Sequence, residues 1–168
     1  MIERHHEADG IRSSALWSVC GAYRYRLSRR WAEGPQLLYI MLNPSRATEA
    51  QNDPTIERCQ RRATALGYGA FTACNLFSLC ATDPRDLKAH TYPDTPDHDQ
   101  VLRAAAGEAD TILCAWGVHG THRNRANEVA ALLHGLPLFC LGTTQAGHPR
   151  HPLYVPYATR PTRWQIPS

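Results

Sequence analysis

The chain has 168 residues, a formal net charge of +3 at pH 7 and a sequence pI of about 8.6. This length suits one domain with a full hydrophobic core, so residues 1–168 are expected to form a single α/β domain. The charge falls short of the pI above about 9 that marks an obvious nucleic-acid-binding domain. The sequence shows neither a signal peptide nor an apolar run of about 18 residues, which argues against a membrane span and predicts a cytoplasmic protein with reduced cysteines.

The six cysteines give no reason to expect a metal or another cofactor. None of them forms a C-x-x-C pair, so the usual spacings of zinc and redox sites are absent. Cys74, Cys114 and Cys140 lie in apolar, strand-like runs, where a free cysteine is typically a core residue. An iron–sulfur cluster gathered from scattered cysteines remains an alternative.

The N-terminal part of the chain predicts a β-hairpin. Residues 1–14 are polar and are expected to form a loose lead-in. The apolar run 15–20 is followed by strict alternation of apolar and polar residues from Tyr23 to Ser28, which indicates a strand with one buried and one basic face. The basic face could contact phosphates, although a solvated edge strand is the simpler interpretation.

The stretch 37–42 is apolar without alternation, which is typical of a strand buried on both faces of a parallel sheet. It ends at Asn43-Pro44-Ser45, because proline cannot donate to a sheet ladder. A helix is expected from Pro54 to about residue 66, with Asp53 as its N-terminal cap. Its arginines at positions 58, 61 and 62 are expected on the solvent side.

Three more strands are expected at 70–74, 111–116 and 138–141, with helices after Asp83, at about 97–109 and around 124–134. This alternation predicts a three-layer α/β/α fold with a short four-stranded parallel sheet plus the N-terminal hairpin. The carboxyl ends of parallel strands share one edge, where open sheets bind ligands. Asn43, Asn75, Trp116-Gly117 and the loop 143–153 would therefore surround one cleft.

The chemistry of these groups limits the possible reactions. The sequence has no Walker A, G-x-G-x-x-G, H-E-x-x-H or G-x-S-x-G motif, which removes the common phosphate-loop, Rossmann, zincin and hydrolase classes. A carboxamide offers donors and an acceptor, so it can read the edge of a nucleobase or hold a water molecule. Histidine can donate to a developing negative charge.

The motifs resemble two families. I-M-L-N-P-S, N-L-F, A-W-G and G-H-P-R-H-P-L are similar to the motifs of an uncharacterised bacterial family of small domains, over about residues 23–155. Their order and spacing also resemble the uracil-DNA glycosylase superfamily, whose strand ends carry G-Q-D-P-Y or G-I-N-P-G, L-L-N, L-L-W-G and A-H-P-S-P-L. Ser45 stands where a bulky tyrosine of that superfamily excludes 5-substituted pyrimidines, so the resemblance does not single out a base.

The second resemblance implies hydrolysis of a base–sugar bond in nucleic acid or in a nucleotide. Asn43 would orient the attacking water, and either His148 or His151 would stabilise negative charge on the leaving base. Asn75 would bind a flipped base, and Leu153 would wedge into the vacated stack. The substrate-binding residues expected on this basis are Leu42, Pro44, Ser45, Asn75, Phe77, Trp116, Gly117 and Leu153.

Two alternatives remain open at this point. The same fold could serve as a non-catalytic module that binds a nucleotide or nucleic acid. A metal-dependent hydrolase could use His119, His122, His148 and His151, although their spacing fits no compact ligand motif. In each nucleotide-related case the expected partner is nucleic acid or a nucleotide, and a monomer is expected.

Overall fold

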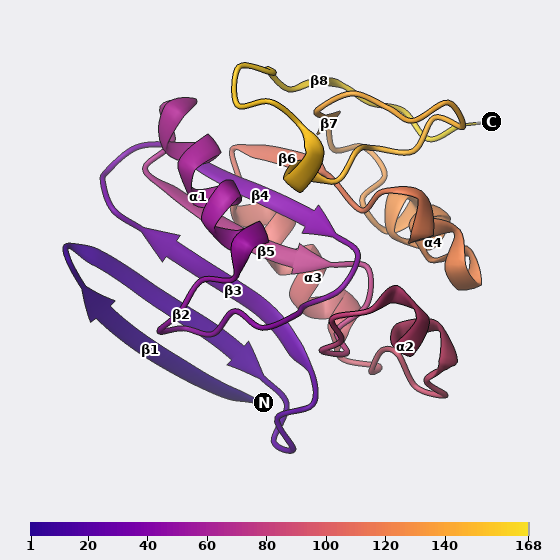
Figure 1. The fold of residues 1–168 in the computed structure, drawn as a ribbon, viewed down its shortest axis with the longest axis horizontal. Coiled ribbons are helices and arrows are strands. Elements are labelled where there is room, and N and C mark those ends of the chain that lie inside the picture. The colour runs from indigo at the N-terminus through magenta and orange to yellow at the C-terminus, as the bar shows by residue number, and fades with distance from the viewer. Residues whose placement is uncertain (168) are drawn as a thin grey trace.

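The computed structural model describes residues 1–167 and shows one large sheet with helices on both faces (Figure 1). The strands are β1 (Ile2–Ala8), β2 (Ile11–Trp17), β3 (Arg24–Arg30), β4 (Gln36–Met41), β5 (Ala70–Asn75), β6 (Thr111–Cys114), β7 (Leu138–Cys140) and β8 (Thr162–Arg163). The α-helices are α1 (Pro54–Ala65), α2 (Pro84–Ala89), α3 (His98–Glu108) and α4 (Arg125–Leu132), and two 3₁₀ helices are η1 (Val118–Asn124) and η2 (Pro152–Tyr154). None of these helices is long and apolar enough to cross a membrane.

The sheet has eight strands in the order β1-β2-β3-β5-β4-β6-β7-β8. Four of its seven pairings are antiparallel, so the predicted four-stranded parallel sheet with a separate hairpin is wrong as a description of the whole. The four strands expected to run parallel do so, in the middle of the larger sheet. The chain is therefore an α/β protein with a mixed, mostly antiparallel sheet.

The loose lead-in predicted for residues 1–14 is also wrong. These residues form β1 and the start of β2, which pair antiparallel along seven residues. Every residue of β1 is exposed, so the strand is held by backbone hydrogen bonds to β2 and needs no apolar alternation. For that reason the hydrophobic pattern of the sequence contains no signal for it.

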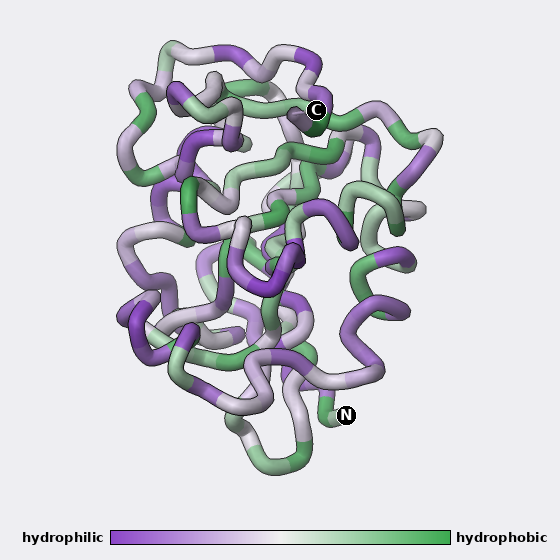
Figure 2. The backbone as a smooth tube through the Cα atoms, turned by 90° about the vertical axis from the view of Figure 1, so that its right-hand side faces the viewer, coloured by the Kyte–Doolittle hydropathy of each residue, from purple (hydrophilic) through white to green (hydrophobic). Residues whose placement is uncertain are grey.

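Strand β4 is central because both of its faces are covered. Leu38 and Ile40 pack into the cluster that includes α3, whereas Leu37, Tyr39 and Met41 pack into the cluster that includes α1. Alternate side chains of a strand point to opposite faces, so an apolar run without alternation needs a helix on each side. Figure 2 shows the resulting hydrophobic stretches crossing the middle of the molecule.

The expected helices are confirmed with small shifts of their ends. Asp53 caps α1 by accepting the main-chain N–H of Ile56 at 2.8 Å, and Pro54 is the first helical residue, as predicted. Strand β6 ends at Cys114, two residues earlier than expected. Trp116 therefore lies in the loop that follows the strand and not in the strand itself.

Candidate functional site

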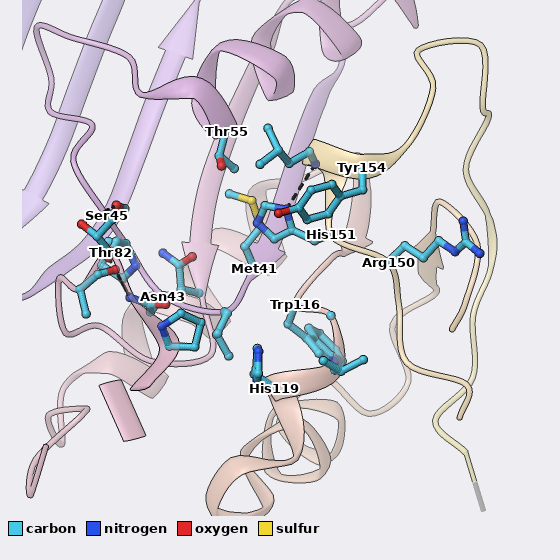
Figure 3. A pocket seen from close by; sticks show the side chains of 18 of the residues that line it. Met41, Asn43, Ser45, Thr55, Thr82, Trp116, His119, Arg150, His151 and Tyr154 are labelled. Carbon is cyan, nitrogen blue, oxygen red and sulfur yellow. Dashed lines mark hydrogen bonds between the residues drawn. The ribbon is translucent and has the colours of Figure 1, made fainter. Parts of the chain in front are cut away.

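A cavity of about 1090 Å³ opens at the carboxyl edge of the parallel strands (Figure 3). Its walls come from the segments that follow β4, β5, β6 and β7, from the last residue of β5, from the start of β3 and from the first turn of α1. This volume of about 1090 Å³ is slightly above the range of about 300–1,000 Å³ that is usual for ligand pockets. Sequence-predicted site residues on its walls are Leu42, Asn43, Pro44, Ser45, Asn75, Trp116, Gly117, His151 and Leu153.

Two predicted site residues do not line the cavity. Phe77 is buried in the core, where its ring lies 5.7 Å from that of His122. His148 lies in the loop after β7, and its main chain exchanges hydrogen bonds with Thr144. Of the two histidines that the motif left open, His151 is therefore the one that lines the cavity.

Asn75 has the most informative environment in the cavity wall. The residue is 1% exposed, and neither the nitrogen nor the oxygen of its carboxamide has a hydrogen-bond partner within residues 1–167. Its main chain is fixed, because its carbonyl oxygen lies 2.7 Å from Nε2 of His98 and the next N–H, of Leu76, donates to Met41 at 2.8 Å. A buried polar group without a partner costs about 1–3 kcal/mol, so this carboxamide is held ready for a partner from outside the chain.

Asn43 is engaged differently. Its Nδ2 donates to the carbonyl oxygens of Ala81 at 2.8 Å, Pro44 at 2.9 Å and Leu79 at 3.3 Å. The amide nitrogen thus holds the segment after β5 against the loop after β4. Within the part of the chain that the structure describes, the Oδ1 atom accepts no hydrogen bond, so this oxygen is the atom of Asn43 that can act on a ligand or a water molecule.

His151 is held in one tautomer by its own loop. Its Nδ1 accepts the main-chain N–H of Leu153 at 3.2 Å, so Nε2 carries the hydrogen and is a donor. Burial lowers the pKa of His151, which keeps the ring neutral at pH 7. Figure 3 shows His151 and Tyr154 next to Met41, and the two rings are 6.1 Å apart.

Two arginines of α1 hold the segment that carries His151. Arg58 donates to the carbonyl of Val155 at 2.8 Å, and Arg62 donates to the carbonyls of Val155 at 2.7 Å and Pro156 at 2.9 Å. The prediction that these arginines lie on the solvent side is wrong for Arg62, which is fully buried. Proline-rich chain leaves many carbonyls without ladder partners, and arginine has enough donors to satisfy several of them.

Arg24 is a cavity residue that sequence reasoning missed. It lies on β3 and is 2% exposed, although the alternation of that strand predicts a basic, exposed face. A register shift between Leu16 and Trp17 places Arg24 opposite Trp17, with its guanidinium 5.9 Å from the indole centroid. Burial lowers the pKa of Arg24. Trp17 is the sequence feature that could have indicated this burial, since arginine often packs on a tryptophan ring.

The one carboxylate on the cavity wall is committed to the backbone, as far as residues 1–167 are concerned. Asp53 accepts the N–H of Ile56 through Oδ1 and the N–H groups of Ala47 and Arg46 through Oδ2. Its role as a helix cap, which the sequence predicts, is confirmed. The cavity therefore offers carboxamides, two imidazoles, an indole and three guanidinium groups, but within the described residues no uncommitted acid.

The structure does not support the alternative of a metal-dependent hydrolase that uses four histidines as ligands. In the described part of the chain, no three or more His, Cys, Asp or Glu side chains gather in a way that could hold a metal ion. His119 lines the cavity with His151, whereas His122 and His148 do not. The four histidines of that hypothesis are thus not brought together.

Comparison with known proteins supports one of the two resemblances. Searches against curated proteins and against solved structures gave no match, so the resemblance to the uracil-DNA glycosylase superfamily is not confirmed. The match to a family model covers residues 24–153 and includes the four motifs on which the other resemblance depends. The chain belongs to the family described as "Protein of unknown function (DUF1643)".

Proposed function

We propose that the protein is an N-glycosidase that binds a nucleobase in the cavity and hydrolyses the bond between the base and its sugar. The observation that carries this proposal is the buried carboxamide of Asn75, whose donor and acceptor atoms have no partner in the described chain. A nucleobase edge presents a neighbouring donor and acceptor, which is the complement of a carboxamide.

The other walls of the cavity suit a flat, partly apolar ligand. Trp116 and Met41 are buried apolar residues at the cavity, and Tyr154 at its mouth is 81% exposed. Aromatic side chains stack on bases and tolerate any base identity. The indole Nε1 of Trp116 also finds no acceptor within residues 1–167, but it lies on the ring edge next to Gly120, which does not line the cavity, so it is not counted as a donor to the ligand.

The proposed reaction follows from these groups. The bond between the base nitrogen and the sugar carbon breaks, and negative charge develops on the base while positive charge develops on the sugar. The Nε2–H of His151 donates to the base and stabilises that negative charge. The Oδ1 of Asn43 orients a water molecule. The oxygen of this water forms a bond to the sugar carbon, and one of its protons is transferred to the base. A cationic sugar does not need a strong general base, which agrees with a cavity without a free carboxylate.

Base release tests the proposal directly. Duplex and single-stranded oligonucleotides that contain uracil, hypoxanthine or xanthine are incubated with the protein and examined for alkali-labile sites, and free nucleosides and nucleotides are examined for released base by chromatography. Replacement of His151 by alanine is expected to lower the rate about 10²- to 10³-fold, as for the removal of other donors to developing charge.

His148→Ala is the matched control, because the two histidines share a motif and only His151 lines the cavity. It is expected to retain the wild-type rate. Absence of base release from every substrate, or equal rates for the two alanine variants, would contradict an N-glycosidase that uses His151.

A second candidate function has one observation in its favour. The Nδ2 of Asn43 is hydrogen-bonded to three carbonyls, and Asp53 is hydrogen-bonded to three N–H groups. Most polar atoms of these two candidate catalytic residues are therefore already used to hold the chain, whereas both polar atoms of Asn75 are free to bind a ligand. A non-catalytic module that binds a nucleotide or nucleic acid would show saturable binding that depends on Asn75, without release of a base. The same set of oligonucleotides and nucleotides distinguishes the two functions.

A further inference from the structure

We propose that the cavity contains an anion subsite at Arg24 and that its ligand is a phosphorylated nucleoside, not a free base or an uncharged nucleoside. The nucleoside part of this inference rests on the proposed function. The phosphate part rests on Arg24 alone and can succeed or fail independently.

Most of the hydrogen-bonding capacity of Arg24 is unused within the described chain. A guanidinium has five N–H donors. Among residues 1–167, the only acceptor within hydrogen-bonding distance of this side chain is the carbonyl oxygen of Ala47, which binds one terminal nitrogen. The Nε atom is buried without an acceptor, and no carboxylate of the described chain lies within ion-pair distance. A buried charge with neither a counter-ion nor its hydrogen bonds is expensive, so an external anion would stabilise it.

The other three buried arginines have more hydrogen-bond or ion-pair partners than Arg24. Arg29 makes five side-chain hydrogen bonds, and Arg62 makes three. Arg125 pairs with Asp94 at 3.0 Å and with Asp99 at 2.5 Å. Each of these three holds neighbouring chain in place. Arg24 has the fewest partners of the four and is also the one that lines the large cavity.

The two carboxylates whose charges act on Arg24, those of Asp53 and Glu49, accept hydrogen bonds from other groups. Asp53 accepts three main-chain N–H groups at the start of α1, which balance its charge locally. Glu49 accepts the indole N–H of Trp17 at 3.2 Å. Both carboxylates act on Arg24 through their charge, but neither lies within ion-pair distance of its guanidinium, so the donors of Arg24 remain available to an anion in the cavity.

Phosphate fits this environment better than a smaller anion would. The planar guanidinium binds two phosphate oxygens at once, which explains why arginine is preferred over lysine for phosphate recognition. Hydroxyl groups of Ser45, Thr55 and Thr82 line the same cavity. Ser45 donates to Thr82 at 3.3 Å, which leaves the hydroxyl hydrogens of Thr55 and Thr82 as donors for further phosphate oxygens. The cavity of about 1090 Å³ leaves room for a base at Asn75 together with a phosphate at Arg24.

Calorimetric titration provides the test. The probes are uridine, adenosine, guanosine and inosine, their 5′-monophosphates, a short single-stranded oligonucleotide and inorganic phosphate. A 5′-monophosphate is expected to bind about 10- to 100-fold tighter than its nucleoside, the usual effect of charge-assisted hydrogen bonds. Arg24→Met is expected to abolish that ratio, and Arg29→Met, which removes a buried arginine away from the cavity, is expected to preserve it.

Each outcome bears on one proposal or the other. Equal affinities of nucleoside and monophosphate for the wild-type protein overturn the anion subsite but leave the proposed function standing. Binding of inorganic phosphate that is lost in Arg24→Met, without binding of any nucleoside, supports the subsite and overturns base recognition. A preference for the oligonucleotide over the monophosphate identifies the phosphate as that of a polymer.

The test does not depend on the folding of Arg24→Met. If that variant fails to fold, competition on the wild-type protein replaces it. Inorganic phosphate is then expected to displace the monophosphate and to leave nucleoside affinity unchanged. Displacement of both probes, or of neither, overturns the subsite.

Discussion

His98 lies 2.7 Å from the main-chain oxygen of Asn75, at the point where β5 reaches the cavity. A carbonyl oxygen can only accept, so Nε2 of His98 carries a hydrogen. Burial lowers the pKa of His98, which favours the neutral ring. Both residues are almost completely buried. This bond links α3 to the end of β5, and it fixes the backbone of the residue that we expect to read the base.

Loss of this bond is predicted to weaken both the fold and the site. His98→Leu leaves the carbonyl of Asn75 buried without its donor, so the free energy of unfolding should fall by about 1–3 kcal/mol. Urea denaturation measures this change. His98→Gln is the control, because its amide can still donate, and it is expected to recover part of the loss. Equal stability of wild-type protein and His98→Leu would show that the bond is not structural.

The buried histidines predict a loss of stability in acid. Burial lowers the pKa of both His98 and His151, whereas in the unfolded chain they titrate near about 6.5. Between the folded and the unfolded pKa the unfolded state binds more protons, so stability is complete above about pH 6.5 and decreases as the pH falls. The groups that act on His98 are Asp94, Asp99 and Arg125, and the first two limit the shift.

This dependence is measured by urea denaturation at several pH values between 7.5 and 5. His98→Gln, which cannot titrate, is expected to show a flatter profile than the wild-type protein. Parallel profiles for the two proteins would exclude His98 as a source of the acid sensitivity.

Asn75→Leu is predicted to stabilise the protein while it removes ligand binding. Both polar atoms of Asn75 are buried without partners in residues 1–167, and leucine has nearly the same shape. The substitution removes a desolvation penalty of about 1–3 kcal/mol, so the midpoint of thermal unfolding should rise. A decrease in the midpoint would mean that the carboxamide is satisfied inside the protein, for example by a bound water molecule.

Asn43→Ala provides the contrast, because the carboxamide nitrogen of Asn43, unlike that of Asn75, is hydrogen-bonded to three carbonyl oxygens. Its removal should lower the free energy of unfolding by about 1–3 kcal/mol. Opposite signs for the two variants would establish that Asn43 supports the loop and that Asn75 is kept free for a ligand. A stabilising effect of Asn43→Ala would contradict this division of roles.

The sequence was sufficient to predict the parts of the fold that depend on apolar runs and caps. The buried strand at 37–42 and the helix start at Asp53 both follow from local chemistry, and the cleft follows from parallel pairing. Strand β1 was missed because pairing with β2, not burial, holds it. The buried positions of Arg24 and Arg62 were missed because each depends on carbonyls that are distant in the sequence.

Substitution of Gly120 is predicted to change the cavity by displacing the indole of Trp116, although Gly120 is not itself part of the cavity wall. A Cβ atom at this position would lie 2.3 Å from Cδ1 of Trp116 and 2.8 Å from its Nε1, so the indole must move. Trp116 is 2% exposed and its ring packs edge-on against Trp164 at 5.3 Å, which leaves it little space. Gly120→Ala is therefore expected to destabilise the protein by about 1–3 kcal/mol and to weaken ligand binding through the displaced indole.

Gly107→Ala is the matched control for this prediction. Gly107 lies in α3, and a Cβ atom there would meet nothing within 4 Å. Alanine is favoured over glycine in a helix, so this variant should be unchanged or up to about 1 kcal/mol more stable. Near-ultraviolet circular dichroism should differ from the wild-type spectrum only for Gly120→Ala, since tryptophan packing changes only there. An unchanged spectrum and affinity for Gly120→Ala would mean that the indole can be displaced without consequence, and Trp116 would then not shape the base-binding wall.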